Sequence, residues 1–274
     1  MVWYRRDGVG VPDWNRGTGL VFQSGTPTPS LLYQTKPRPS CTKPETVQLP
    51  KTNVIVTEVG HLLKAILFDL DGTILDTRDL ILHSMKHAYV AVLGADALIS
   101  DDELLSMVGI PLQDQMEHFS PEKSEELLEA YREENLKVQD AMLKGFSGMA
   151  AALTALKAEG YRMAVVTSKR NAPAVHGLEQ MGLADFFEFV LGSDDTAEHK
   201  PNPGPLLDAA KLMGRAAEDC VYVGDSPYDM LAARSANMLA IGALWGMFSK
   251  EILLEAGAEV FISDISELSQ VLMG

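Results

Sequence analysis

Cysteine is scarce in this 274-residue chain, and no apolar run is long enough to cross a membrane. The two cysteines, Cys41 and Cys220, lie far apart, which excludes a disulfide framework and a cysteine-rich zinc motif. The longest apolar stretch, residues 236–248, is broken by Asn237 and two glycines and falls short of the roughly 18 residues of a membrane span. No compact apolar segment follows the first arginines, as a secretory signal would require. We therefore expect a cytoplasmic protein that does not bind membranes.

Positive charge is also in short supply over most of the chain. The net charge is -15, and because residues 1–60 carry +3, residues 61–274 carry -18. Such an acidic surface repels nucleic acid and anionic lipid, so we expect neither as a partner. An anionic substrate would need a local positive group, such as a metal ion or a fixed lysine. We expect a monomer or a weak homodimer that acts on a small molecule.

Residues 1–60 differ in composition from everything that follows. They contain seven prolines and scattered glycines and serines, and they show no sustained helical or strand period. Such a segment cannot bury enough apolar surface to fold, so we predict a disordered N-terminal extension. An added edge strand at Val54–Val59 and a partner-binding role for the aromatic residues of this segment are the alternatives.

After residue 60 the hydrophobic pattern becomes regular and predicts an α/β protein. An apolar run at Lys64–Phe68 indicates a buried strand, and four helices follow it with no strand among them. From Met149 onward helices and strands alternate, as in a parallel sheet covered by helices on both faces. We therefore predict a doubly wound, Rossmann-like core formed by residues 61–76 and 145–274, with residues 77–144 inserted as an all-helical cap. The expected cap helices are Thr77–Leu93, Ser100–Val108, Pro111–Phe119 and Pro121–Ala141. The later strands of the core are expected at Tyr161–Thr167, Phe187–Leu191, Asp219–Val223, Leu239–Ile241 and Val260–Ile262. The core helices are expected at Met149–Glu159, Ala172–Met181, Gly204–Met213 and Met230–Ala236.

Two carboxylates follow the first predicted strand, in the segment Asp69-Leu70-Asp71-Gly72-Thr73. Because one residue separates them, Asp69 and Asp71 can point into the same crevice as the chain turns, and Gly72 permits dihedrals that are closed to other residues. One carboxylate can attack phosphorus while its neighbour transfers protons. A fragment of a calcium loop and a plain turn are the alternatives.

Three further strand ends carry polar groups that suit the same chemistry. The hydroxyls of Thr167 and Ser168 can donate to a phosphate oxygen, and Lys200, before a proline, offers a fixed positive charge for a phosphoryl group. Asp225 and Asp229 follow an apolar run and supply the hard oxygen ligands that Mg²⁺ prefers. Because catalytic groups in parallel sheets lie just past the carboxyl ends of the strands, we expect these residues to share one site.

In order and spacing, these four segments resemble the motifs of the haloacid dehalogenase superfamily, in its phosphatase branch. The resemblance covers residues 61–274 and implies a phosphatase that works through an aspartyl phosphate and requires Mg²⁺. It also implies the catalytic residues, which are Asp69 as nucleophile, Asp71 as general acid and base, and Thr167 and Lys200. The implied phosphate-binding residues are Gly72, Thr73 and Ser168. The implied metal site is formed by Asp69, Asp71, Asp225 and Asp229. Ser168 departs from the pattern, since relatives often have Asn there.

The substrate is less well defined by the sequence than the reaction. The turn Gly109–Gln113 resembles the cap loop of phosphoglycolate phosphatases and of relatives that cleave inorganic pyrophosphate, so Leu112 and Gln113 are expected to contact the substrate. Our first choice is 2-phosphoglycolate, and inorganic pyrophosphate, a sugar phosphate or a nucleotide are the alternatives. The resemblance further implies that the cap closes over the site, with Gly145 and Gly148 as hinge candidates.

Other functions are less consistent with the sequence. A β-phosphoglucomutase would have histidine where Ile81 stands, and a non-catalytic binding module of the same fold would have no need of Asp71. A P-loop kinase is excluded, because no Gly-x-x-x-x-Gly-Lys-Ser/Thr stretch is present. His83 and His87 have the spacing of a helical metal pair, but no third ligand is evident in the sequence, so we expect them to be ordinary cap residues.

Overall fold

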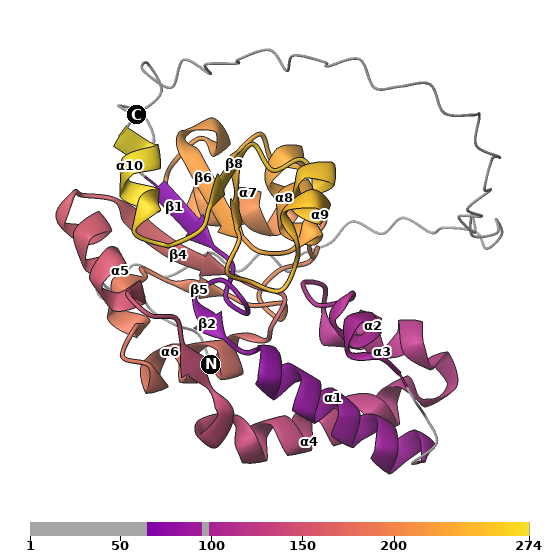
Figure 1. Cartoon of the computed structure of the whole chain (residues 1–274). Coiled ribbons are helices and arrows are strands. Elements are labelled where there is room, and N and C mark those ends of the chain that lie inside the picture. Colours follow the sequence, from indigo (N-terminus) through magenta and orange to yellow (C-terminus); the bar gives the residue numbers. More distant parts are fainter. Residues whose placement is uncertain (1–64, 95–98, 274) are drawn as a thin grey trace, which may run out of the picture. The chain divides into compact units, whose positions relative to one another are not determined.

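The computed structural model describes residues 65–94 and 99–273 (Figure 1). The predicted N-terminal extension and the alternative strand at Val54–Val59 lie outside these residues. Within the described ranges, no helix combines the length and the hydropathy that crossing a bilayer requires.

Six parallel strands form the central sheet, in the order β5-β4-β1-β6-β7-β8. Strand β1 lies in the middle and pairs with β4 on one side and β6 on the other. The chain thus builds the sheet outward from β1 in both directions, so β1, β4 and β6 end side by side at a topological switch point. The strands are β1 Ala65–Phe68, β4 Arg162–Val166, β5 Val190–Leu191, β6 Cys220–Gly224, β7 Leu239–Ala243 and β8 Val260–Ile262.

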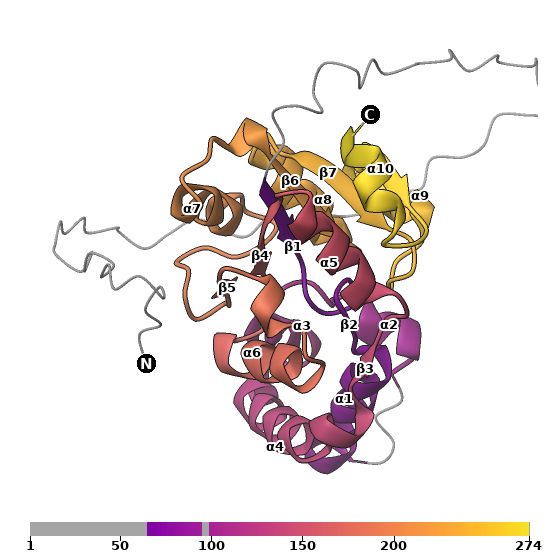
Figure 2. The ribbon, with the colours of Figure 1, turned by 90° about the vertical axis from the view of Figure 1, so that its left-hand side faces the viewer.

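Side chains alternate between the two faces of the sheet, and each face has its own hydrophobic core. On β1, Ile66 and Phe68 belong to one core, and Ala65 and Leu67 belong to the other. Helices α5, α6 and α10 complete the first core, and α7, α8 and α9 complete the second (Figure 2). The predicted doubly wound class is therefore confirmed. These helices are α5 Met149–Ala158, α6 Asn171–Gln180, α7 Gly204–Leu212, α8 Pro227–Ser235, α9 Lys250–Ala256 and α10 Glu267–Met273.

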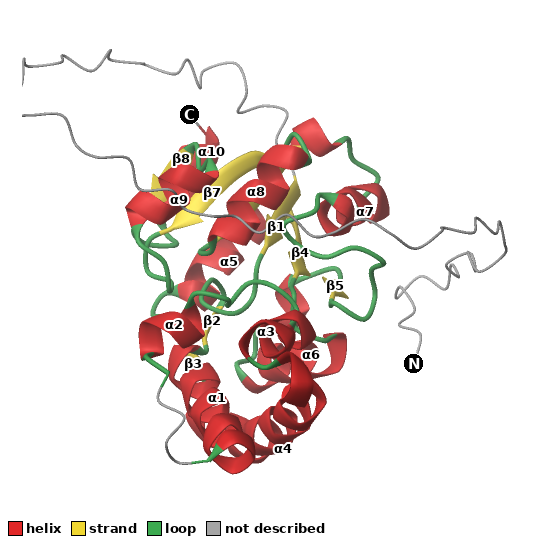
Figure 3. Cartoon of the chain, turned by 90° about the vertical axis from the view of Figure 1, so that its right-hand side faces the viewer, coloured by secondary structure: helices red, strands yellow, loops and turns green. Residues whose placement is uncertain are grey.

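A separate group of helices forms the cap between β1 and α5 (Figure 3). The helices are α1 Arg78–Leu93, α2 Asp101–Leu105, α3 Leu112–Phe119 and α4 Ser124–Met142, and they enclose a third hydrophobic core. Two short antiparallel strands, β2 Leu75–Asp76 and β3 Lys144–Gly145, connect the cap to the core. Gly145, a predicted hinge residue, lies in this ribbon and pairs with Leu75.

Most predicted boundaries lie close to the observed ones, and the differences have local causes. Helix α8 begins at Pro227, earlier than predicted, because Ser226 and Asp229 form a capping box at its N-terminus. Strand β5 is shorter than predicted, since its first predicted residues directly follow the 3₁₀ turn Ala184–Phe186 and lie outside the sheet. The helix predicted to begin at Pro121 starts with the 3₁₀ turn Pro121–Lys123, and α4 begins at Ser124.

Candidate active site

Three polar side chains follow neighbouring strands of the sheet: Asp69 after β1, Thr167 after β4 and Asp225 after β6. All three are buried. The hydrogen bonds between strands continue one residue past β1 and β4. The Asp69 amide donates to the Val223 carbonyl and the Thr167 amide donates to the Leu191 carbonyl, each at 2.9 Å. These bonds fix the backbone from which the side chains project. The predicted convergence at the strand ends is therefore observed.

The turn after Asp69 depends on Gly72. This glycine has a φ of +83°, and its amide donates to the Leu75 carbonyl at 2.8 Å. A Cβ atom at Gly72 would lie 2.3 Å from Oδ2 of Asp225, closer than any side chain can approach. The next residue, Thr73, donates its hydroxyl to Oδ1 of Asp225 at 3.3 Å. Gly72 and Thr73 thus join the first strand end to the third.

Lys200 lies between two acidic side chains in the interior. Its Nζ donates to Oδ1 of Asp69 at 2.7 Å, to Oδ1 of Asp229 at 2.6 Å and to the Tyr222 hydroxyl at 3.0 Å. Burial alone would lower the pKa of Lys200, but the Asp229 and Asp69 carboxylates outweigh it and hold the pKa well above its ordinary value. Lys200 is therefore a charged ammonium group that faces the proposed nucleophile.

Asp229 is held on both of its carboxylate oxygens. Its Oδ1 accepts from Lys200, and its Oδ2 accepts from the amide of Ser226 at 3.0 Å and the hydroxyl of Ser226 at 2.6 Å. Tyr222 donates to the Val166 carbonyl at 2.8 Å and lies 3.2 Å from Oδ1 of Asp229. Asp229 is fully buried, so these hydrogen-bond donors replace the water that its carboxylate charge would otherwise need.

Asp225 is packed between two glycines. A Cβ atom at Gly72 or at Gly246 would collide with its carboxylate group, and the Met247 amide donates to its Oδ2 at 2.6 Å. Burial and the charges of Asp69 and Asp229 raise the pKa of Asp225 well above its ordinary value. Burial, with a smaller effect of Asp229, likewise raises the pKa of Asp69 from 3.8 to about 7, against the opposing effect of Lys200.

The three acids form a group that could hold a metal ion. Asp69, Asp225 and Asp229 each place a carboxylate oxygen within 4.8 Å of the others, and no other such group of acids, histidines or cysteines occurs in residues 65–94 and 99–273. Lys200 pairs with Asp69 and Asp229, so two negative charges are left in a buried space when all three carboxylates are ionised, and a divalent cation would neutralise them. The donors are all oxygens, which suits a hard cation.

Asp71 lies at the edge of this buried group and faces a cavity. Lys169 donates to both of its carboxylate oxygens, at 3.1 and 3.3 Å. The side chains of Asp71 and Lys169 are 16% and 14% exposed, so both remain in reach of a bound molecule. The carboxylate is held in one orientation while it stays accessible, as a proton-transfer group requires.

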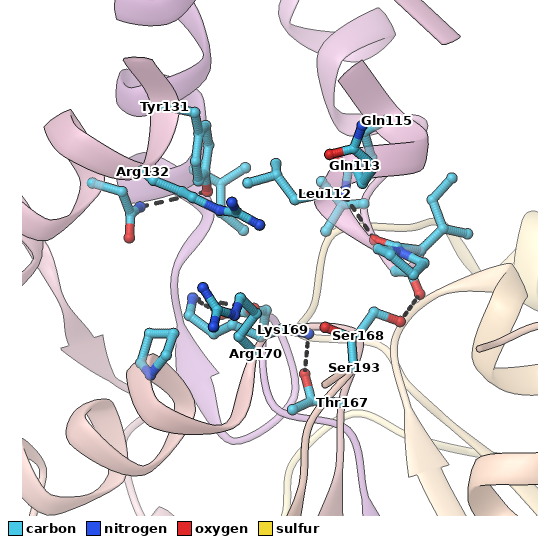
Figure 4. A pocket seen from close by; sticks show the side chains of 18 of the residues that line it. Leu112, Gln113, Gln115, Tyr131, Arg132, Thr167, Ser168, Lys169, Arg170 and Ser193 are labelled. Carbon is cyan, nitrogen blue, oxygen red and sulfur yellow. Dashed lines mark hydrogen bonds and ion pairs between the residues drawn. The ribbon is translucent and has the colours of Figure 1, made fainter. Parts of the chain in front are cut away.

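A cavity of about 620 Å³ opens above these strand ends, with the cap forming its other wall (Figure 4). From the core it is lined by Asp69, Asp71, Thr167 and Asp225, and from the cap by residues of α3, α4 and the loop before α3. The predicted substrate-contacting residues Leu112 and Gln113 both line it (Figure 4). This volume suits a small molecule.

Ser168 connects the core to the cap. Its hydroxyl donates to the Gly109 carbonyl at 2.6 Å, in the loop that precedes α3 (Figure 4). Gly109 has a φ of +113°, and a Cβ atom there would lie 2.6 Å from the Ser226 hydroxyl oxygen. The predicted phosphate-binding hydroxyl of Ser168 therefore contacts the cap loop in this structure.

The histidine pair of the cap has an acidic neighbour that is not evident in the sequence. Glu134 of α4 lies 2.9 Å from Nε2 of His83 and 3.9 Å from Nε2 of His87, and Lys137 also contacts it, at 3.2 Å. The sequence could not indicate this neighbour, because it lies on a different helix. The three side chains do not bring their ligand atoms within 4.8 Å of one another, so they remain ordinary cap residues.

Several residues of the site were missed by the sequence analysis. Tyr222 lies inside a strand and has the pattern of a core residue, and Gly246 and Met247 come from the loop after β7. Lys169 and the cap residue Arg132 line the cavity. Tyr222 alternates onto the same face as Cys220, which indicates burial but says nothing of its hydroxyl.

Comparison with known proteins gives consistent results. Residues 66–243 match the family of haloacid dehalogenase-like hydrolases. A protein of Caldanaerobacter subterraneus named as a candidate pyrophosphatase PpaX is 38% identical over 212 residues, which are 77% of this chain and 96% of that protein. The pyrophosphatase PpaX of Anoxybacillus flavithermus is 30% identical over 77% of this chain and 97% of its own length.

The fold is also shared with solved structures. A crystal structure from Clostridium acetobutylicum, described as a predicted phosphatase, aligns with a TM-score of 0.69 and 27% identity. The alignment covers 76% of this chain and 97% of that one.

Proposed function

Since the chain belongs to the family of haloacid dehalogenase-like hydrolases and is a phosphatase of that family, we propose that it is a Mg²⁺-dependent enzyme that forms an aspartyl phosphate on Asp69. The observation that carries this proposal is the buried group of Asp69, Asp225 and Asp229 around Lys200. A binding module without chemistry would gain nothing from concentrating these charges in its interior.

In the proposed reaction, Asp69 attacks phosphorus and the bond from phosphorus to the leaving oxygen breaks. Oδ1 of Asp69 accepts from Lys200, so Oδ2 is the attacking oxygen. Asp71 gives a proton to the leaving oxygen, and it then takes a proton from the water that attacks the aspartyl phosphate. This second step releases inorganic phosphate and restores the Asp69 carboxylate. Lys200 and Thr167 stabilise the charge on the phosphoryl oxygens.

The residues fit Mg²⁺, and we assign its site to the carboxylates of Asp69 and Asp225 and the backbone carbonyl of Asp71. Asp229 supports this group, since both of its oxygens are engaged by Lys200 and Ser226. When bound, the ion would offset the repulsion between the Asp69 carboxylate and an anionic substrate. Gly72, Thr73 and Ser168 complete the phosphate-binding segment, although the Ser168 hydroxyl would have to leave Gly109 to take part.

We assign substrate selection to the cap, residues 77–144, and catalysis to residues 61–76 and 145–274. Among possible substrates, the names of the PpaX relatives favour inorganic pyrophosphate. The choice made from the sequence, 2-phosphoglycolate, remains a prediction. Both compounds are small, and both carry a second anionic group beside the phosphoryl group that is transferred.

Phosphate release from a panel of compounds tests the proposal. The panel contains pyrophosphate, 2-phosphoglycolate, sugar phosphates and nucleotides, each with Mg²⁺ and with EDTA. Turnover should require Mg²⁺ and should fall by about 10³-fold or more in Asp69→Asn, because that change removes the nucleophile. The matched control is Asp208→Asn, which changes an exposed aspartate of α7. A folded Asp69→Asn protein with wild-type activity would overturn the assignment.

A further inference from the structure

The cavity has a second charged region, separate from the buried acids, on the wall formed by α4 and the loop after β4 (Figure 4). Arg132 comes from cap helix α4, and Lys169 and Arg170 come from the core. Figure 4 shows the side chains of Arg132 and Arg170 directed into the cavity from opposite sides. Residues 61–274 carry a charge of -18, so these three cations around one cavity are the kind of local positive group that an anionic ligand would need.

The three cations differ in the partners they already have. Lys169 is paired with Asp71, and Nε of Arg170 contacts Oδ2 of Asp194 at 3.3 Å. Arg132 has no hydrogen bond or ion pair with any residue in the described part of the chain. An exposed arginine often lacks a partner, but this one lies opposite another guanidinium group.

The charge of Arg170 acts on the Arg132 guanidinium group across the cavity. Burial, followed by the charge of Arg170, lowers the pKa of Arg132, against the smaller effects of Glu125 and Asp194. Asp194 accepts from Nε of Arg170 at 3.3 Å and from the Asn171 amide at 2.7 Å, so one side of the Arg170 guanidinium group is already paired. An anion between the two arginines would replace this repulsion with two attractions.

We propose that Arg132 and Arg170 together bind the second anionic group of the substrate. The enzyme would then select small phosphates that carry another phosphate or a carboxylate over phosphomonoesters with an uncharged leaving group. Guanidinium groups suit this task, since each can donate two parallel hydrogen bonds to a phosphate or a carboxylate. The assignment rests on the proposed function and narrows its substrate class.

The position of Arg132 gives the interaction a second effect. Arg132 belongs to the cap and Arg170 to the core, so an anion bound by both connects the two parts across the cavity. Substrates with the second anionic group would therefore hold the cap against the core, whereas those without it would not.

The test compares Arg132→Gln and Arg132→Lys with the wild type on pyrophosphate, 2-phosphoglycolate and p-nitrophenyl phosphate. We expect Arg132→Gln to lower the ratio of kcat/KM for the two doubly anionic substrates to that for p-nitrophenyl phosphate by about 10- to 100-fold, as for the loss of charge-assisted hydrogen bonds. Arg132→Lys should restore part of the ratio, because it keeps the charge. The matched control is Lys137→Gln, which removes one positive charge from the same helix outside the cavity.

If Arg132→Gln left the ratio of kcat/KM between the doubly anionic substrates and p-nitrophenyl phosphate unchanged, the proposal would be overturned. This holds both when kcat/KM falls equally for all substrates and when it falls for none. A binding measurement separates this result from a failure of the proposed function. Calorimetry with methylenediphosphonate, which is not hydrolysed at its bridging carbon, needs no turnover. Binding that weakens at least about 10-fold in Arg132→Gln would support the anion site even if the wild type hydrolysed nothing. Equal binding by both proteins would refute the anion site.

Discussion

Replacement of Lys200 by methionine perturbs the buried charges most directly. The Lys200 side chain is 1% exposed, and its ammonium group lies within 2.7 Å of one oxygen of Asp69 and one of Asp229. Methionine is apolar and similar in length, so the packing changes little while the charge is lost. Without the ammonium group, three buried carboxylates face one another with no cation between them.

The expected loss of stability follows from this geometry. Removing one partner of a buried ion pair costs about 3–5 kcal/mol, because the remaining charge is left without compensation. In a chain of this size, 1 kcal/mol corresponds to about 2–4 °C in Tm, so Tm should fall by roughly 6–20 °C. The loss should be greater at pH 8.5 than at pH 6, since at the lower pH the facing carboxylates can bind a proton.

Urea unfolding in the presence of EDTA measures this loss. The matched control is Lys137→Met, which removes an ammonium group that is 72% exposed and pairs with Glu134. It should cost much less than Lys200→Met, because Lys137 is exposed and Glu134 keeps its contact with His83. If Lys200→Met cost no more than Lys137→Met, Lys200 would not compensate the buried carboxylates as we describe.

Three further results are expected from the same site and its surroundings. Mg²⁺ at about 100 times its Kd should stabilise the folded protein by about 2.7 kcal/mol in thermal unfolding, and Asp225→Asn should remove most of this stabilisation. Equal stabilisation of the wild type and Asp225→Asn by Mg²⁺ would place the ion elsewhere. Gly246→Ala should weaken Mg²⁺ binding by at least about 10-fold in calorimetry, because the new Cβ would lie 2.2 Å from Cβ of Asp225. Gly145→Ala is the control and should leave Mg²⁺ binding unchanged, because the nearest atom to its new Cβ is 3.6 Å away. Burial raises the pKa of the Cys220 thiol from 9.0 to about 11. In a Cys41→Ser background, alkylation of Cys220 should therefore be slow at pH 8 and accelerate as the pH rises toward 11. Rapid labelling of the native protein at pH 8 would contradict this burial.

Much of the fold could be predicted because its signals are local. The apolar strands β1, β4 and β6 each lead directly to a polar residue, so the sequence indicated both the sheet and the edge that carries the site. Helices α5, α6 and α7 end close before the glycines Gly160, Gly182 and Gly214, whose positive φ angles match the predicted helix ends.

The remaining features depend on contacts between distant segments. Glu134 meets His83 only because α1 and α4 pack together, and Met247 reaches Asp225 only because β7 lies beside β6. Arg132 follows the buried Tyr131 on α4, and nothing in the helical period distinguishes an arginine that faces a cavity from one that faces solvent. The sequence could therefore predict the chemistry of the site better than its substrate.

The measurement that tests the central claim most directly is the detection of the phosphorylated aspartate. The protein would be mixed with Mg²⁺ and pyrophosphate or 2-phosphoglycolate, quenched with acid, and digested for peptide mass spectrometry. Any aspartyl phosphate that forms in the Asp71→Asn variant should persist longer than in the wild type, since this variant keeps Asp69 but lacks the group that activates water for the second step. We predict one added phosphoryl group on the peptide that contains Asp69, absent with EDTA and absent in Asp69→Asn. Turnover with no phosphoryl group on that peptide, or with the group on another residue, would contradict the account.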